Sequence, residues 1–325
     1  MLSIKEINKA YDSIKSFIVK TPLVTNENFN SLFGAKIYFK LENLQQTGSF
    51  KIRGASYKVL LLTNNQKKNG VVAYSSGNHA QAVAFATLKY GIDSLIVMPD
   101  NAPKIKIKNT KKYGAKIILY DSKKEIREEI GRKIERSSGR TLIKPYDDLN
   151  VITGQGTVGK EISEQLKELN ITPDLYLCCC GGGGLIAGSS FYLKDKYPQL
   201  KVYSVEPIEF NDTFLSLKKN RIISNKNTAN SICDALLASC PGKLTFDINK
   251  QILAGGLSVS DADVKKAIKI IAETLKLIVE PGGAAAVAAL LANKVKVKNK
   301  TVVVMLSGGN IDADLFSKIL TTNYE

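Results

Sequence analysis

The chain of 325 residues is 44% hydrophobic and 23% charged, which is typical of globular proteins and excludes disordered, collagen-like and disulfide-scaffold classes. The length suits two domains, no apolar run reaches the ~20 residues of a membrane helix, and the charged N-terminus lacks a signal peptide's apolar core, so we expect a cytoplasmic protein. The net charge of +16 is spread along the chain and aromatic residues make up only 7%, so we expect no nucleic-acid or membrane partner.

Apolar β-branched runs alternate with amphipathic stretches along the chain. The runs predict strands at 36–39, 70–74, 94–98, 115–119, 175–178, 201–205 and 301–306. The stretches between them predict helices at 51–62, 80–90, 105–113, 124–136, 156–169, 185–197, 261–275 and 284–291. Because the strands are apolar throughout, they indicate a buried parallel sheet, and we predict a doubly wound α/β fold. Ligands in such folds bind beyond the carboxyl ends of the strands.

The first unusual segment is Thr47-Gly48-Ser49-Phe50-Lys51-Ile52-Arg53-Gly54, which begins a predicted helix. The helix dipole disfavours a cation in the first turn and so favours a neutral Lys51 amine, which can form a Schiff base. The chain has 46 Lys and Arg residues, so a surface lysine is the simpler explanation when this segment is considered alone.

A second segment, Ser75-Ser76-Gly77-Asn78-His79-Ala80, follows the strand predicted at 70–74. Backbone N–H groups at a helix start, together with serine and asparagine side chains, suit a carboxylate. Simple helix capping explains the same residues equally well. His79 is the only histidine, which excludes metal sites built on several histidines and leaves one candidate for any Ser-His-Asp scheme.

A third segment, Cys180-Gly181-Gly182-Gly183-Gly184-Leu185, joins a predicted strand to a predicted helix. Four residues without Cβ atoms let backbone N–H groups close on an anion at the helix start, so we predict a phosphate site. The spacing of Gly182, Gly184 and Ala187, followed by Glu206, also fits a nicotinamide-binding oxidoreductase, and this alternative stays open.

The remaining signals are weaker when taken singly. Ser307-Gly308-Gly309-Asn310 closes the last predicted strand and places a hydroxyl where a ligand edge would lie. A turn explains it as well. The five cysteines, three of them consecutive at 178–180, have no C-x-x-C spacing, so we predict buried, reduced thiols and no zinc site.

Taken in this order, the four segments resemble the fold type II family of pyridoxal-phosphate enzymes, which includes threonine and serine dehydratases and serine racemase. The resemblance extends through Thr21-Pro22-Leu23, Lys40-Leu41-Glu42-Asn43, Gly154-Gln155-Gly156-Thr157 and Val279-Glu280-Pro281-Gly282-Gly283. It implies two doubly wound, open twisted sheets in a large domain (1–46 and 148–325) and a small domain (47–147). It also implies an active site between the domains, pyridoxal 5′-phosphate as the cofactor, and a homodimer.

The resemblance also implies a role for each matching residue. Lys51 forms the Schiff base and then removes the Cα proton. The cofactor phosphate lies in a loop made of Gly181, Gly182, Gly183, Gly184 and Leu185. The cofactor ring is contacted by Asn78, Phe50 and Ser307, and Glu280 lies near the cofactor. The substrate carboxylate is surrounded by Ser75, Asn78 and His79.

The implied activity is that of an ammonia-lyase, which eliminates the hydroxyl of threonine or serine to give a 2-oxo acid and ammonia. A neutral Ser307 leaves the pyridine nitrogen unprotonated, which favours prompt elimination over a long-lived carbanion. Serine racemase is an alternative, because Ser76 matches the acid/base on the opposite face in racemases. Against it, Ala238 and Lys133 stand where racemases have serine and arginine. A 3-hydroxyaspartate ammonia-lyase is a further alternative.

The resemblance to racemases extends to a cation site. Glu206, the carbonyl oxygen of Phe210 and Asp212 match ligands that bind Mg²⁺ or Ca²⁺ there, and a monovalent cation is a further option. Carboxylates and a backbone oxygen are the ligands of hard cations. A solvated acidic loop is the simpler alternative for the same residues.

Overall fold

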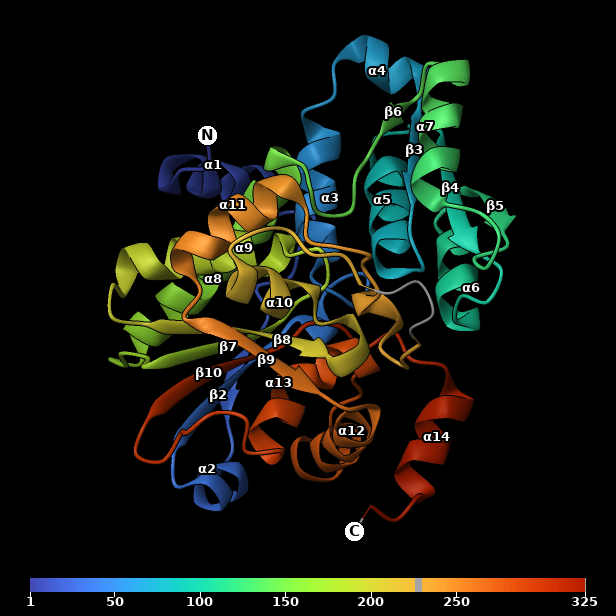
Figure 1. Ribbon diagram of the computed structural model, residues 1–325. Helices are drawn as coiled ribbons and strands as arrows, with labels where there is room; N and C mark the ends of the chain where they lie inside the picture. Colours follow the sequence, from blue (N-terminus) through green and yellow to red (C-terminus); the bar gives the residue numbers. More distant parts are fainter. Residues whose placement is uncertain (226–229, 325) are drawn as a thin grey trace.

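The computed structural model describes residues 1–225 and 230–324, and within them the chain folds around two β-sheets (Figure 1). A six-stranded sheet has the order β1-β2-β10-β7-β8-β9, and a four-stranded sheet has the order β5-β4-β3-β6. The strands are β1 (Leu23–Thr25), β2 (Lys36–Leu41), β3 (Val71–Tyr74), β4 (Ser94–Pro99), β5 (Lys116–Tyr120), β6 (Thr141–Leu142), β7 (Leu175–Cys179), β8 (Lys201–Pro207), β9 (Gly255–Val259) and β10 (Thr301–Leu306). All neighbours pair in parallel except β1, which pairs antiparallel with β2.

Helices cover both faces of each sheet, which confirms the predicted doubly wound arrangement. The α-helices are α1 (Ile4–Ile14), α2 (Glu27–Phe33), α3 (Lys51–Leu60), α4 (Asn64–Asn69), α5 (Asn78–Lys89), α6 (Lys104–Lys112), α7 (Arg127–Ser138), α8 (Leu149–Glu168), α9 (Gly184–Lys196), α10 (Asp212–Lys219), α11 (Lys243–Ile252), α12 (Asp261–Leu275), α13 (Pro281–Leu291) and α14 (Ala313–Thr321). Short 3-10 turns are η1 (Glu42–Leu44), η2 (Ile208–Phe210) and η3 (Asp234–Leu236).

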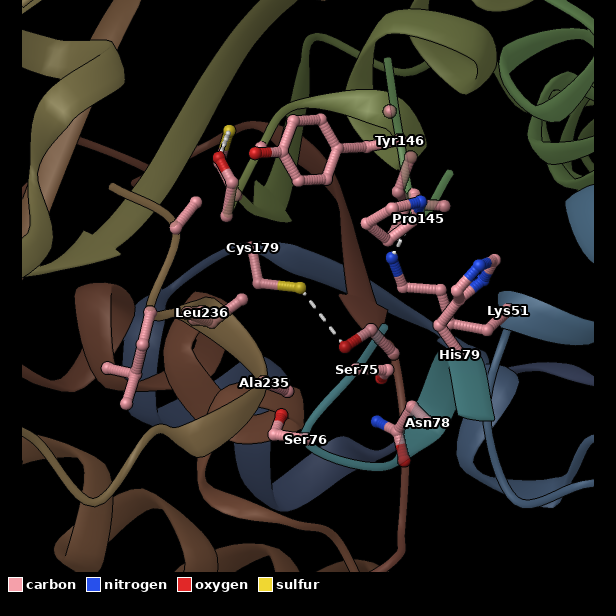
Figure 2. A pocket seen from close by; sticks show the side chains of 18 of the residues that line it. Lys51, Ser75, Ser76, Asn78, His79, Pro145, Tyr146, Cys179, Ala235 and Leu236 are labelled. Carbon is pink, nitrogen blue, oxygen red and sulfur yellow. Dashed lines mark hydrogen bonds between the residues drawn. The ribbon is translucent and has the colours of Figure 1, made fainter. Parts of the chain in front are cut away.

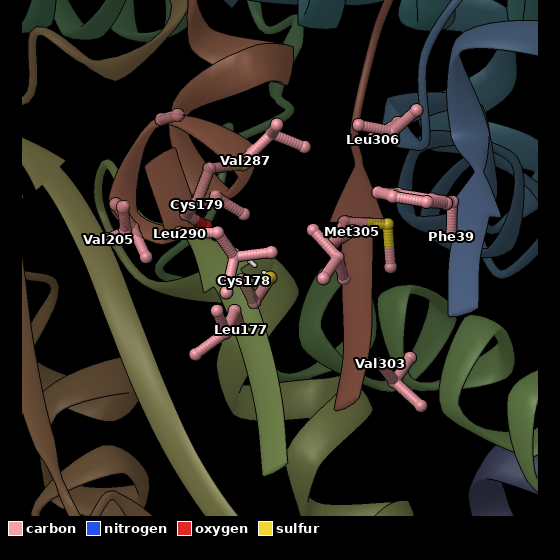
Figure 3. Packing of buried hydrophobic residues seen from close by; sticks show 14 of the residues in the cluster. Phe39, Leu177, Cys178, Cys179, Val205, Val287, Leu290, Val303, Met305 and Leu306 are labelled. Carbon is pink, nitrogen blue, oxygen red and sulfur yellow. Dashed lines mark hydrogen bonds between the residues drawn. The ribbon is translucent and has the colours of Figure 1, made fainter. Parts of the chain in front are cut away.

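The main core surrounds the six-stranded sheet. Figure 1 shows α8 and α9 on one side of this sheet and α12 and α13 on the other. Side chains of the central strands, such as Leu177 and Met305, share one buried cluster with Val287 and Leu290 of α13 (Figure 3). Because both faces are covered by helices, the central strands are apolar throughout and do not alternate with polar residues.

The four-stranded sheet has its own core on each face. Ile52 of α3 and Val83 of α5 share a buried cluster with Ile96 of β4. On the opposite face, Val72 and Val97 form a second cluster. Ile130 and Ile134 of α7 pack against that second cluster. The small sheet is therefore enclosed by helices from segments adjacent to it in the sequence.

Helix α3 joins the two sheets through a buried charge network. The Arg53 guanidinium, with no exposed surface, makes two hydrogen bonds to the carboxylate of Glu42 and two to that of Glu161. Lys40 Nζ adds a bond of 2.7 Å to Glu161. Glu42 follows strand β2 and Glu161 belongs to α8, so Arg53 fixes the start of α3 against the six-stranded sheet.

All the predicted strands and helices form, with shifted ends. Helix α8 begins at Leu149 instead of residue 156, because Asp148 caps it by accepting hydrogen bonds from the N–H groups of Asn150 and Val151. The pattern did not predict the short strands β1, β6 and β9, nor the helices α1, α2, α4, α10, α11 and α14. No helix in the described ranges is both long and apolar enough to cross a bilayer.

Candidate active site

The four segments singled out in the sequence meet at one cavity, lined by residues that follow β3, β7 and β10 and by the start of α3. The predicted residues that line it are Phe50, Lys51, Ser75, Ser76, Asn78, His79, Gly181, Gly182, Gly183, Gly184, Leu185 and Ser307. Since these residues follow strands of both sheets, the cavity is built from both sheets (Figure 2).

Lys51 is the first residue of α3, and its side chain points into this cavity toward Pro145 (Figure 2). Its Nζ donates a hydrogen bond of 2.8 Å to the carbonyl oxygen of Pro145. The pKa of this amine is lowered to about 8, mainly by burial and also by the nearby Arg127, against the opposite effect of Cys179 and Glu280. The neutral, nucleophilic form of Lys51 is therefore far more accessible than that of an exposed lysine.

The position of Lys51 is fixed by the end of strand β10. The N–H of Phe50 donates a hydrogen bond of 3.1 Å to the carbonyl oxygen of Ser307. Ser49 and Gly308 form an isolated antiparallel bridge beside it. The start of α3 and the end of β10 therefore hold the Lys51 amine and the Ser307 hydroxyl on the walls of one cavity.

The tetraglycine loop joins β7 to α9 and presents its N–H groups for an anion. Among the described residues, none of the N–H groups from Gly181 to Leu185 donates to a backbone carbonyl outside helix α9. The carbonyl oxygen of Gly182 accepts from the Thr245 hydroxyl at 2.7 Å. A Cβ at Gly182 would lie 2.3 Å from the Tyr146 ring. The loop therefore fits a phosphate: glycine is required there, and free donors stand at a helix start.

The segment after β3 is already hydrogen-bonded to its surroundings. The Ser75 hydroxyl accepts from the N–H of Gly77 at 3.0 Å, and the Ser76 hydroxyl donates to the carbonyl oxygen of Asp234 at 3.1 Å. The buried Asn78 amide donates to Glu280 and accepts from the Asn310 side chain at 2.9 Å. Glu280 does not line the cavity, but it reaches the cavity wall through Asn78.

His79 is neutral and buried. Its Nε2 lies 2.9 Å from the carbonyl oxygen of Ile143, which can only accept, so Nε2 carries the proton and Nδ1 is a bare acceptor without a partner. Burial, with the charge of Lys51, lowers the pKa of His79 to about 3. The ring has no N–H left to donate to a carboxylate, and the predicted contact of His79 with a substrate carboxylate stays a prediction.

The Ser307 hydroxyl has a cysteine as its partner. The thiol of Cys179 lies 3.0 Å from the Ser307 oxygen (Figure 2). The position opposite the expected ring nitrogen is therefore occupied by a hydroxyl and a thiol and by no carboxylate. Cys178, Cys179, Cys180 and Cys233 are buried, and all five cysteines are unpaired thiols. Within the described ranges no cluster of three or more His, Cys, Asp or Glu residues gathers.

The acidic residues predicted to bind a cation lie outside the cavity. Both oxygens of Glu206 accept N–H groups at the start of α10, from Thr213 and Phe214, each at 2.8 Å. Burial, and then the neighbouring Asp212, raise the pKa of Glu206, and burial raises the pKa of Asp212 to about 7. Oδ2 of Asp212 has no partner. A buried acid pair with a free oxygen fits a cation better than it fits a solvated loop.

The cavity lining also contains residues that were not predicted as site residues, among them Arg127, Tyr146 and Cys179. Arg127 had no distinguishing signal in the sequence, because it stands on an amphipathic helix rich in charged residues. Lys133, which was compared with an arginine of racemases, is exposed on α7. Among the described residues, Arg127 is the arginine that lines the cavity, and the match of Lys133 to the racemase arginine stays a prediction.

Comparison with known proteins places this geometry in a family. The model of the family described as pyridoxal-phosphate dependent enzymes matches residues 14–308. The chain belongs to this family. It is 39% identical to the serine racemase of Schizosaccharomyces pombe over 97% of the chain and 96% of the relative. It is 38% identical to the L-threo-3-hydroxyaspartate ammonia-lyase of Saccharomyces cerevisiae over 97% of the chain and 95% of that relative.

Solved structures of pyridoxal-phosphate enzymes share the fold. The threonine deaminase of T.th. is 36% identical and superposes with a TM-score of 0.90 over 96% of this chain and 99% of its own. Maize serine racemase is 35% identical, with a TM-score of 0.91 over 97% and 96%. The predicted fold type II architecture and the predicted family are therefore confirmed. The nicotinamide alternative loses its ribose ligand, because Glu206 is fully buried and both of its oxygens cap α10.

Proposed function

We propose that this pyridoxal-phosphate enzyme is an ammonia-lyase that eliminates the hydroxyl of a 3-hydroxy amino acid of the serine and threonine type, releasing a 2-oxo acid and ammonia. The observation that carries the proposal is the Lys51 amine, with its pKa lowered to about 8, in one cavity with the tetraglycine loop. A nucleophilic amine and a phosphate cradle are the two features needed to hold a phosphorylated aldehyde.

Each of these residues has a separate role in the proposed reaction. When bound, the cofactor withdraws electrons from the substrate and makes its Cα proton acidic. Gly181 to Leu185 would hold the phosphate, and the Lys51 amine would hold the aldehyde end of the cofactor. The Lys51 amine, when neutral, would also be the base that accepts the Cα proton. Ser307, held by Cys179, would place a hydroxyl and no carboxylate at the ring nitrogen, which would favour early departure of the substrate hydroxyl.

Arg127 is the cation available to a substrate carboxylate. It lines the cavity beside Ser75 and Ser76, and it lowers the pKa of Lys51, so its charge is felt at the reacting position. Its Nε is engaged with Glu128 at 2.9 Å, which leaves the other guanidinium N–H groups to donate. We propose that Arg127, and not His79, orients the substrate carboxylate together with Ser75 and Asn78.

Racemisation is the second candidate, and two observations favour it. The Ser76 hydroxyl and the Lys51 amine both line the cavity, as an exchange of the Cα proton between two faces requires. Arg127 supplies an arginine on the cavity wall. Ala238 also lines the cavity and still departs from the racemase serine. A 3-hydroxyaspartate substrate fits the same residues, since Arg127 and a basic cavity suit a second carboxylate.

We also propose the larger assembly implied by the family. The strands of the four-stranded sheet fall between residues 71 and 142, which supports a small domain at 47–147 and a large domain formed by 1–46 and 148–325. A homodimer is proposed from the resemblance alone. Glu206, the carbonyl oxygen of Phe210 and Asp212 are proposed to hold Mg²⁺, Ca²⁺ or a monovalent cation.

The test incubates purified holoenzyme with L-serine, L-threonine and L-threo-3-hydroxyaspartate and measures both 2-oxo acid and D-amino acid. We expect 2-oxo acid from at least one substrate. In Ser76→Ala, racemisation should fall by about 10²-fold or more while elimination persists, since a positioned acid or base contributes that much. Absence of 2-oxo acid with all three substrates contradicts the lyase proposal. Equal loss of both activities contradicts the role of Ser76.

A further inference from the structure

Lys106 is a fully buried cation whose side chain connects a helix beside the four-stranded sheet to residues beside the six-stranded sheet. It lies on α6, beside the four-stranded sheet, and its side chain has no exposed surface. Its Nζ lies 2.7 Å from Oδ2 of Asp234 in η3 and 2.7 Å from Oε2 of Glu280, which precedes α13. A Cβ at Gly77 would lie 2.1 Å from the Lys106 side chain, so glycine at 77 gives the lysine its path to the carboxylates.

This lysine is charged despite its burial. Burial alone would lower the pKa of Lys106, but Asp234 and Glu280 outweigh burial and raise it. Burial raises the pKa of the Glu280 carboxyl, against the effect of Lys106. The other ionisable groups near Glu280 are Lys51 and Cys179, on the cavity wall. A cation between two acids is the arrangement in which removing the cation leaves uncompensated buried charge.

Both partners of Lys106 hold the walls of the active site. Oε1 of Glu280 accepts a hydrogen bond from the side chain of Asn78. The carbonyl oxygen of Asp234 accepts from the hydroxyl of Ser76. Asp234 and the next two residues, Ala235 and Leu236, line the cavity. The ion pairs of Lys106 therefore fix the two segments that contact Ser76 and Asn78.

A second contact joins α6 to the part of the chain that forms the six-stranded sheet. The carboxylate of Asp312, next to α14, accepts the N–H groups of Lys104 at 3.0 Å and Ile105 at 2.8 Å. The first turn of helix α6 is therefore held by Asp312 through backbone N–H groups and by Asp234 and Glu280 through the Lys106 side chain. Asp234, Glu280 and Asp312 belong to the part of the chain that forms the six-stranded sheet. Helix α6 instead packs against β5 of the four-stranded sheet.

We propose that Lys106 is a positioning residue that holds α6 and the loop at 75–78 against η3 and Glu280, and so keeps the cavity closed around the bound cofactor. The proposal rests on the assignment of this cavity to the cofactor, and it does not depend on which amino acid is the substrate. Lys106 acts through Asp234 and Glu280 and touches no reacting atom.

The experiment compares Lys106→Met with Lys108→Met, which removes an exposed lysine from the same helix. Hydrogen exchange of the apoprotein should speed up in α6 and in residues 232–238 of Lys106→Met, and remain unchanged in β7 and β10. Cofactor affinity should fall by about tenfold or more, because apparent affinity scales with the fraction of closed molecules. Lys108→Met should match the wild type in both measurements.

A pH series separates this role from simple loss of core stability. Burial already raises the pKa of Glu280, and loss of the lysine removes the cation that opposes this effect, so cofactor affinity of Lys106→Met should recover as falling pH protonates Glu280. The double variant Lys106→Met/Asp234→Asn lacks the repulsion of Glu280 by Asp234 and should depend less on pH. The wild type should show no such recovery.

The outcomes are decisive without an assay of turnover. Asp234→Asn, which removes one ion pair at a partly exposed side chain, should speed exchange in the same two segments by a smaller factor. The Asp234→Asn variant replaces Lys106→Met in the experiment if Lys106→Met does not fold. Unchanged exchange in the folded variants, or a cofactor affinity with no recovery at low pH, overturns the proposal. A wild type that binds the cofactor but yields no 2-oxo acid contradicts only the proposed reaction.

Discussion

The Lys51 amine has a pKa of about 8, and this value gives the residue a measurable signature. Only the neutral amine attacks an aldehyde. The rate at which apoprotein captures pyridoxal phosphate should therefore rise with pH, reach half of its maximum near pH 8 and level off above that pH. The measurement is the absorbance of the lysine-bound cofactor after rapid mixing between pH 6 and 10, corrected with free lysine as a control. A rate that keeps rising to pH 10 would mean that the cavity does not lower this pKa.

At the residue scale, most of the predicted site residues do line the cavity. The residues that form hydrogen bonds with them were predicted less often. Lys51 and Ser307 were predicted from the resemblance of four segments, taken in order, to the fold type II family, and not from either segment alone. Cys179 was predicted only as a buried thiol, since nothing in Cys178-Cys179-Cys180 tells which thiol meets Ser307. Arg127 was missed because its direction depends on how α7 packs on the small sheet, which no local pattern contains.

The tetraglycine turn between β7 and α9 can be tested as an element. Gly182→Ala would place a Cβ 2.3 Å from the Tyr146 ring, and such overpacking costs about 1–3 kcal/mol. We expect weaker cofactor binding and a lower Tm. Adding Tyr146→Ala should restore part of the lost Tm. Gly255→Ala, whose Cβ would have ordinary contacts at 3.5 Å, serves as control. Full cofactor affinity in Gly182→Ala would contradict the role of the turn.

Long periodic elements were predicted from the sequence and short ones were not. Helix α12 matched its predicted range, because Ser260 and Asp263 form a capping box that marks its start. Strand β6 has two residues and β1 has three, too few for any periodicity to be visible. The start of helix α8 was predicted too late because its first turns carry Gly154 and Gly156, which weaken the helical pattern in the sequence. The close packing of Gly154 on Arg53 explains why glycine stands there.

At the scale of the whole molecule, the buried network of Arg53 couples the two sheets. Replacing Arg53 by Met leaves Glu42 and Glu161 with fewer cations, and breaking a buried pair in this way costs about 3–5 kcal/mol. The control is Lys58→Met on the same helix, whose ion pair with Asp148 is partly exposed and contributes at most about 1 kcal/mol. Urea unfolding of both variants measures the difference. An equal loss of unfolding free energy in the two variants would show that the buried network stabilises the protein no more than an exposed ion pair does.

The proposed cation site also acts on the stability of the whole chain. A cation that binds only the folded state stabilises it by about 2.7 kcal/mol at a concentration 100 times its Kd. Ca²⁺ or Mg²⁺ should therefore raise the Tm of the wild type and leave that of Asp212→Asn unchanged. Asp195→Asn, at an exposed acid, should respond as the wild type does. A wild-type Tm that neither ion changes would argue against a divalent cation.

The central claim is a covalent bond between the Lys51 amine and the aldehyde of the cofactor. Borohydride reduction of the holoenzyme makes that bond permanent, and peptide mass spectrometry then finds the modified residue. We predict a phosphopyridoxyl group on Lys51, and no such product at any residue in Lys51→Ala. The same group found on a different lysine of the wild type, or on none, would contradict the account.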